Sequence, residues 1–249
     1  MVGDKELAAL RQIYYHLLVH LLWKEPEPEF VASLSEGLDE RTEAAEQLNP
    51  RLGAGWRMIG EYLAKKGPAE VGDEFTRLFL GPYNVEVNPY ESYYLAGGLF
   101  KEPLIEVRNF MAQTGMQKAG EDYAEPEDAL AFELEIMNWL IQKQLDAKTN
   151  KAEQRWVEAQ ATFLKQHLLV WVPACARDIE GAESARFYKG AAALLVGLLE
   201  MDEAQFHGIG PEKAETLEEA RKRHGGRRPW KGPTYDPNAI SEPSGELES

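Results

Sequence analysis

Two histidines, His16 and His20, are four residues apart, a spacing that places both imidazole rings on one face of a helix. Such a pair can share a metal ion, but the sequence between them lacks the glutamate of the zinc-protease motif, and no third ligand is evident. The single cysteine, Cys175, has no surrounding motif that marks a nucleophile, and a buried apolar role is expected for it. The chain also has neither a Walker loop nor a dinucleotide-binding glycine fingerprint. We therefore expect no catalytic site, no metal site and no bound cofactor.

The stretch from residue 74 to 95 is the most distinctive part of the chain. Its first half carries apolar residues at the i, i+3, i+4 spacing of one buried helix face, and a Gly-Pro pair then ends the helix. A loop and a tyrosine-rich segment follow. The helix-face residues are Phe75, Leu78 and Phe79, the pair is Gly81 and Pro82, and the tyrosines are Tyr90, Tyr93 and Tyr94. Clustered tyrosines beside prolines favour recognition of another chain, and the alternative is that the rings fill a helical core.

Acidic residues gather in a second region, around Asp128. Glu133 and Glu135 are two residues apart and cannot face one another on a helix, but with Glu125 and Asp128 they form an acid-rich edge. Acids in the first turn after a helix-opening proline, here Pro126, stabilise the helix dipole by ~0.3–1 kcal/mol. From position alone, Asp128 is therefore expected to contribute to local helix stability.

Composition and charge limit the class of partner. The 249 residues have 44% hydrophobic content, enough for one large domain with a proper core. The net charge of -15 disfavours nucleic acid and anionic membranes and favours a basic peptide or protein, although it also serves solubility. The first 24 residues lack a basic n-region and a cleavage site, and no apolar run approaches the ~18 residues of a membrane span. We expect a cytoplasmic protein.

The hydrophobic pattern predicts helices along the chain. Sustained two-residue alternation and Asn-Gly or Asp-Gly hairpin turns are absent from the sequence, so a sheet is not expected. We expect an all-α, single-domain bundle of about ten helices over residues 1–224 and an irregular, locally basic tail over 225–249. Residues 185–201 are apolar nearly all round and should form the most buried helix. Other expected helices cover 69–80, 126–147 and 151–171, the last kinked or restarted by Pro173.

Three blocks of residues carry a family resemblance. The first block (75–94) reads Phe75-x-x-Leu78-Phe79-x-Gly81-Pro82, followed by Pro89-Tyr90-Glu91-Ser92-x-Tyr94. The second block (125–137) opens with Glu125-Pro126-Glu127-Asp128-Ala129-Leu130, and the third block (163–173) reads Phe163-Leu164-x-x-His167-Leu168-x-x-Trp171-x-Pro173. In this order they resemble the TorD/DmsD/NarJ family of redox-enzyme maturation chaperones. In the second block Glu127 replaces the family's proline and Ala129 its histidine, which leaves Asp128 alone of that triplet.

The resemblance implies a function in binding without chemistry. The partners would be the signal or leader peptide and the immature catalytic subunit of a molybdenum-cofactor oxidoreductase, held until the cofactor is inserted and export can proceed. An alternative within the family is a NarJ-like assembly factor for a membrane-bound, non-exported reductase. An alternative of a different class is an all-α nucleotide-binding enzyme. The family implies a monomer or a domain-swapped dimer, and the sequence does not choose between them.

The resemblance also assigns the expected peptide-binding residues. Tyr90 and Tyr94 are expected to be exposed aromatic anchors, and Glu91, Glu125 and Asp128 an acidic rim that attracts arginines. The complete expected set is Phe75, Leu78, Phe79, Gly81, Pro82, Pro89, Tyr90, Glu91, Ser92, Tyr94, Glu125 and Asp128.

The last 25 residues differ in composition from the rest. Low hydrophobicity and four prolines make a disordered extension the default expectation. The alternative rests on the segment Arg227-Arg228-Pro229-Trp230-Lys231, which loosely resembles the twin-arginine motif that such chaperones bind. In that case the tail would fold back on the acidic body and compete with the client peptide.

Overall fold

The structure is a computed structural model, and it describes residues 5–81, 85–118 and 125–226. Helices dominate this part of the chain, and its strand-like pairing is limited to one bridge between Tyr90 and Ala129. The all-α prediction is confirmed. Pro82 and the segment from Arg227 to Lys231 lie outside the described residues. Among the described helices, none is long and apolar enough to cross a membrane.

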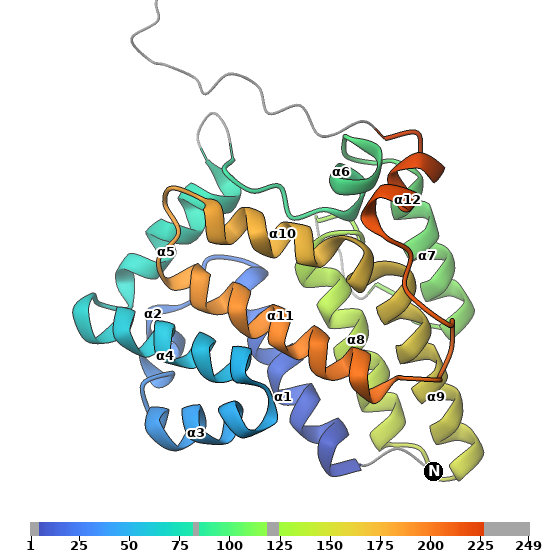
Figure 1. Cartoon of the computed structure of the whole chain (residues 1–249), viewed down its shortest axis with the longest axis horizontal. Helices are drawn as coiled ribbons and strands as arrows, with labels where there is room; N and C mark the ends of the chain where they lie inside the picture. Colours follow the sequence, from blue (N-terminus) through green and yellow to red (C-terminus); the bar gives the residue numbers. More distant parts are fainter. Residues whose placement is uncertain (1–4, 82–84, 119–124, 227–249) are drawn as a thin grey trace, which may run out of the picture.

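The described residues form a succession of helices (Figure 1). In chain order they are α1 (Lys5–Leu22), α2 (Pro28–Ser33), α3 (Leu38–Leu48), α4 (Pro50–Lys65), α5 (Ala69–Phe75), the π-helix η1 (Thr76–Leu80), α6 (Glu91–Ala96), α7 (Glu102–Thr114), α8 (Leu130–Leu145), α9 (Asn150–Phe163), the π-helix η2 (Leu164–Leu168), α10 (Leu169–Gly181), α11 (Phe187–Gln205) and α12 (Leu217–Arg223).

Helix α11 lies at the centre of the bundle, with α4 on one side and α10 on the other (Figure 1). A Cβ atom added to Gly55 of α4 would come within 2.9 Å of the Gly190 carbonyl oxygen of α11, and a Cβ on Gly190 within 2.9 Å of the Gly55 oxygen. Glycine at both positions is what lets the two backbones approach so closely. Helix α11 has more buried residues than any other described helix, which confirms the expectation for residues 185–201.

A buried ion pair joins the first helix to the central one. Arg11 of α1 donates Nε to Oδ1 of Asp202 at 2.6 Å and Nη2 to Oδ2 at 2.8 Å. The Tyr15 hydroxyl also donates to Asp202 Oδ2, at 2.7 Å. Both charged side chains are almost fully buried, so removing either partner would leave an uncompensated charge inside the core.

Helix α5 is anchored to the N-terminus of α11. Glu74 is buried, and its carboxylate accepts hydrogen bonds from the backbone N–H groups of Arg186 at 2.7 Å, Phe187 at 3.1 Å and Tyr188 at 2.8 Å. These N–H groups have no partners within their own helix, and a carboxylate also offsets the positive end of the helix dipole. The start of the first block is thereby held in a fixed place.

Several expected helix boundaries are wrong. The helix expected to begin at Pro126 begins at Leu130, so Glu127 and Asp128 precede it and do not stabilise its first turn. The expected helix over 69–80 is split into α5 and η1, and the one over 151–171 into α9, η2 and α10. Pro173 neither ends nor restarts a helix, since it lies inside α10, and the irregular turn is η2.

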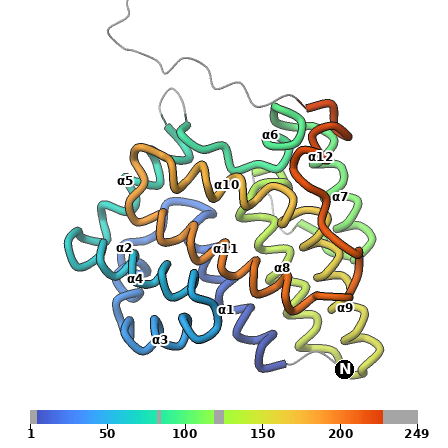
Figure 2. The backbone as a smooth tube through the Cα atoms, viewed as in Figure 1, coloured from blue at the N-terminus to red at the C-terminus, as the bar shows by residue number. Residues whose placement is uncertain are grey.

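The C-terminal part of the described chain packs against α6, a helix from the middle of the sequence. Figure 2 shows the segment after α11 running along one side of the molecule to α12, which packs against α6. Arg221 of α12 donates Nε to the Tyr94 carbonyl oxygen of α6 at 2.8 Å. Helix α12 therefore supports the end of the first block.

Candidate functional site

The first block begins as a helix face that packs inward. Phe75, Leu78 and Phe79 are all buried, with Leu78 fully enclosed. The rings of Phe75 and Phe79 lie 5.2 Å apart, and that of Phe79 lies 5.3 Å from Tyr188 of α11. This part of the prediction, that the face packs into the core, is confirmed.

A turn and a backbone hydrogen bond then redirect the chain. Gly81 follows η1 with φ of +39°, a conformation that side-chain-bearing residues rarely adopt. Val87 donates its backbone N–H to the Leu78 carbonyl oxygen at 3.0 Å, so the loop returns to the helix it left.

The first and second blocks are paired through their backbones. Glu91 donates its N–H to the Asp128 carbonyl oxygen at 2.9 Å, and Leu130 donates to the Pro89 oxygen at 2.8 Å. Ser92 donates its N–H to Asp128 Oδ2 at 3.0 Å and its hydroxyl to the same oxygen. The implied placement of Asp128 beside the first block is confirmed.

A small apolar pocket, called the apolar pocket below, opens where the two blocks meet. Its volume is about 50 Å³. The lining residues are Leu22, Trp23, Phe75, Phe79, Leu80, Pro89, Tyr90, Glu125, Ala129, Leu130, Ala131 and Phe132. The pocket therefore unites five expected site residues with the end of α1 and the start of α8.

One acid lies at the surface of the apolar pocket. Glu125 is exposed, and its Oε2 accepts a hydrogen bond from the Tyr90 hydroxyl at 2.6 Å. Partial burial and this hydrogen bond raise the pKa of the Tyr90 hydroxyl, which therefore stays a donor at neutral pH. The apolar wall and the carboxylate together form an amphipathic contact surface.

Other expected site residues lie beneath the surface. Tyr94 is 2% exposed and donates its hydroxyl to Asp178 Oδ2 at 2.9 Å, so the expectation that it is an exposed anchor is wrong. Glu91, Ser92 and Asp128 are buried too, and the expected acidic rim is reduced to Glu125 of its three members. Through these contacts the buried residues position the loop.

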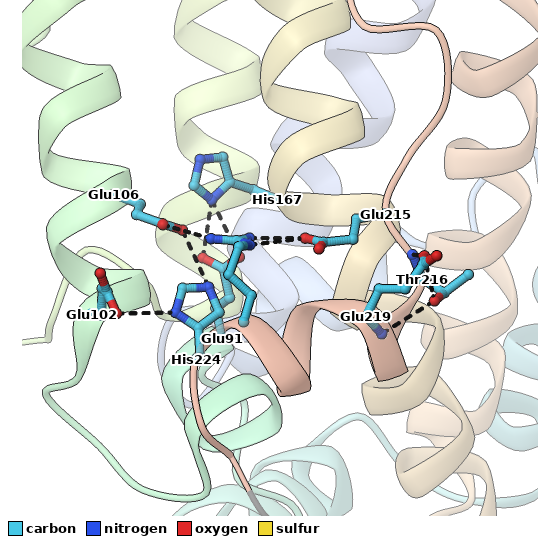
Figure 3. Close-up of polar contacts among 9 residues, drawn as sticks. Glu91, Glu102, Glu106, His167, Glu215, Thr216, Glu219 and His224 are labelled. Atoms are coloured by element: carbon cyan, nitrogen blue, oxygen red, sulfur yellow. Dashed lines mark hydrogen bonds and ion pairs between the residues drawn. The ribbon is translucent and has the colours of Figure 1, made fainter.

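A buried polar cluster lies under the first block. His167 of η2 places Nδ1 3.0 Å from Oε2 of Glu91, and Figure 3 shows the ring directed at that carboxylate. Trp171 donates Nε1 to Oε2 of Glu133 at 3.0 Å. Burial raises the pKa of the Glu133 carboxyl well above its ordinary value, and the nearby acid Glu91 raises this pKa further. The cluster links α6, α8, η2 and α10.

A larger cleft of about 800 Å³ lies on another face, between α7, α9, η2 and the segment before α12. Its lining combines apolar side chains with charged ones of both signs, which include Glu106, Glu215 and Arg223. Arg223 pairs with Glu106 at 2.7 Å and with Glu215 at 2.9 Å, and both carboxylates are drawn in Figure 3. His167 also lines this cleft, so the buried cluster lies at its inner wall.

The sequence interpretation missed several residues of these sites. Trp23 directly follows the first amphipathic helix, and its place in the apolar pocket has no local signal. Phe132 lies within the second block, and its helical spacing alone predicts a core residue. Glu133, an acid within an apolar run, and His167 and Trp171 of the third block did carry a signal, which is polar residues on an otherwise buried helix.

Comparison with known proteins identifies the relatives of this chain. The family described as nitrate reductase delta subunit matches residues 45–177, which is more than half of the chain and includes the three blocks. Relatives named Chaperone protein TorD are similar as well. The one from Vibrio parahaemolyticus is 29% identical over 141 residues, which are 56% of this chain and 65% of that relative.

Two further relatives give the same result. The TorD chaperone of Photobacterium profundum is 31% identical over 138 residues, 54% of this chain and 63% of the relative. That of Vibrio cholerae serotype O1 is 29% identical over 134 residues, 53% of this chain and 60% of the relative. The chain thus spans less than two thirds of the length of the curated relatives it matches. The structure pairs the first two blocks that carry the resemblance. The chain belongs to the TorD/DmsD/NarJ family of redox-enzyme maturation chaperones, because the family match covers more than half of it.

Proposed function

We propose that this protein is a system-specific chaperone for the catalytic subunit of a molybdenum-cofactor oxidoreductase. It binds the signal or leader peptide in the cytoplasm and delays export until the cofactor is inserted. Family membership and the relatives named as TorD chaperones support the class of function. The observation that carries the peptide-binding role is the apolar pocket at the junction of the first two blocks, with Glu125 at its edge.

The size of the apolar pocket favours a side chain over a cofactor. Small-molecule and cofactor sites usually measure ~300–1,000 Å³, whereas this pocket measures about 50 Å³. An apolar side chain of a leader peptide is the kind of group that this space accepts. Peptides that dock through one or two such anchors gain affinity from the excluded water around them.

The charge at the pocket edge favours a basic residue next to that anchor. Glu125 is exposed, and a carboxylate can accept two parallel hydrogen bonds from an arginine. The net charge of -15 adds attraction at longer range for a basic leader. An apolar stretch flanked by arginines meets both requirements.

Binding of synthetic leader peptides, measured by calorimetry on the full chain, tests the proposal. Tyr90→Ala should weaken binding at least about fivefold, as expected for an aromatic anchor. The matched control is Phe100→Ala, which removes a ring that is 71% exposed and does not line the apolar pocket. Equal effects of the two changes, with unaltered circular dichroism, would contradict the assignment of the pocket.

The family description favours a second candidate client. A nitrate-reductase-type assembly factor would bind the N-terminus of a membrane-bound reductase that is not exported and carries no arginine pair. Replacing both arginines of a leader by glutamines separates the two candidates. Affinity falls if the client is an exported enzyme with a twin-arginine leader, whereas an N-terminal peptide without arginines binds undiminished in the other case.

A further inference from the structure

The buried polar cluster contains an acid oxygen that the chain itself does not satisfy. Glu133 is fully buried, and while its Oε2 accepts from Trp171, its Oε1 is buried with no hydrogen-bond partner. Asp128 Oδ1, on the neighbouring segment, is in the same situation. A buried carboxylate oxygen without a partner costs ~1–3 kcal/mol or more, and a bound cation or a proton at this point would offset that cost.

Two further metal-ligating side chains face the same point. One donor atom each from Glu91, Glu133 and His167 lies within 4.8 Å of the others, and no second group of three in the described part of the chain meets this criterion. Glu91 Oε2 and His167 Nδ1 are already 3.0 Å apart. Atoms that bind one ion at ~2.0–2.2 Å are separated by about 3 Å, so this pair needs little movement to share an ion.

We propose that Glu91, Glu133 and His167 form a binding site for one divalent transition-metal ion, of the kind represented by Zn²⁺ or Mn²⁺. Two carboxylate oxygens and one imidazole nitrogen form a mixed donor set that suits these ions. Mg²⁺ and Ca²⁺ prefer donor sets made of oxygen alone. The two buried carboxylates also supply the negative charge that a divalent ion offsets.

The neighbours of the three side chains hold them in place. The hydrogen bond from Trp171 fixes the orientation of the Glu133 carboxylate, as outer partners of metal ligands commonly do. The Phe163 ring stacks on His167 with 4.7 Å between centroids and restricts its rotation. The three donors come from α6, α8 and η2, so a bound ion would join the first block to the centre of the bundle.

The larger cleft gives the ion a route from solvent. His167 lines this cleft of about 800 Å³, together with Phe110 and Lys165. Of the three proposed ligands, His167 is the one that borders this cleft, so the cleft is the side from which an ion would approach. None of the three side chains lines the apolar pocket, so the inference does not depend on peptide binding.

Metal titration of the chelator-treated full chain tests the proposal. Calorimetry with ZnCl₂ and with MnCl₂ should give one ion per chain, and the melting temperature should rise with metal concentration. Glu133→Gln keeps the side-chain volume and removes the charged ligand, and it should weaken Zn²⁺ binding at least about tenfold. Co²⁺ loading should give visible absorption bands that this variant lacks.

The exposed pair His16 and His20 provides the matched control, because their rings lie 4.3 Å apart at the surface and can bind metal adventitiously. The double change His16→Gln/His20→Gln should leave one Zn²⁺ site intact. Zn²⁺ binding that disappears with this pair and survives Glu133→Gln overturns the proposal. So does a wild-type chain that binds none of these ions, in which case a shared proton compensates the two acids. If Glu133→Gln loses helicity by circular dichroism, His167→Gln is measured in its place against the same criteria.

Discussion

Ser92 donates both its backbone N–H and its hydroxyl to a single oxygen of Asp128, and all of these groups are buried. This contact joins the first block to the second across 36 positions of the chain. Asp128, the one residue of its triplet that fits the family pattern, therefore has a structural role in this chain. The carboxylate fixes the loop that carries Tyr90.

The first prediction concerns this contact. Ser92→Ala should lower the free energy of unfolding by ~1.5–3 kcal/mol, because a hydrogen bond to a buried charged acceptor is lost. Urea denaturation followed by circular dichroism measures the change. Ser35→Ala, at an exposed position, is the control and should stay within ~0.5 kcal/mol of the wild type. A Ser92 variant as stable as the control would show that the loop does not depend on this hydroxyl.

The sequence predicts features that are encoded locally. The helical spacing of apolar residues predicts the all-α class, the inward face of Phe75 and Leu78, and the burial of α11. The sequence does not predict the two π-helices. A π-helical turn has a different period and changes the direction in which side chains point, but no change in residue type marks it in the sequence.

Features that depend on distant partners are predicted less well. Tyrosine is a residue type that is common at recognition surfaces, yet Tyr94 is buried and donates its hydroxyl to the partly buried Asp178. The pairing of Glu91 with His167 joins positions 76 residues apart, and no spacing in the sequence indicates it. Whether an acidic side chain is buried depends on which helices surround it. The sequence alone does not show which helices these are.

A second prediction uses two leucines of η1 that differ in burial. Leu78 is fully buried, whereas Leu80 is 58% exposed and lines the apolar pocket. Leu78→Ala should cost ~2–5 kcal/mol of stability, because it leaves a cavity in the core. Leu80→Ala should leave thermal stability nearly unchanged and weaken leader-peptide binding instead. The reverse pattern in denaturation and calorimetry would place the binding surface elsewhere.

A third prediction concerns salt. If Glu125 pairs with an arginine of the leader, affinity should fall as salt rises, because screening weakens exposed charge pairs. Glu125→Gln should flatten this dependence, whereas Glu61→Gln, an exposed acid of α4 that does not line the apolar pocket, should not. Calorimetric titrations at low and high NaCl measure the slopes. Parallel slopes for all three proteins would mean that apolar contact alone selects the peptide.

The fourth prediction concerns Cys175, the buried thiol of α10. Burial is the main cause that raises the pKa of Cys175 to about 12, from an ordinary value of 9.0. The native state therefore holds this proton more tightly than the unfolded chain, and the free energy of unfolding is unaffected by this group below about pH 9. The free energy of unfolding falls as pH rises from about 9 toward 12.

At pH 8 a thiol-specific reagent should react with the native protein at least about 100-fold more slowly than with the urea-unfolded chain, because reaction requires opening of the core. Cys175→Ala should abolish the labelling in both states and reduce the loss of stability above pH 9. Rapid labelling of the native protein at pH 8 would contradict the burial on which this prediction depends.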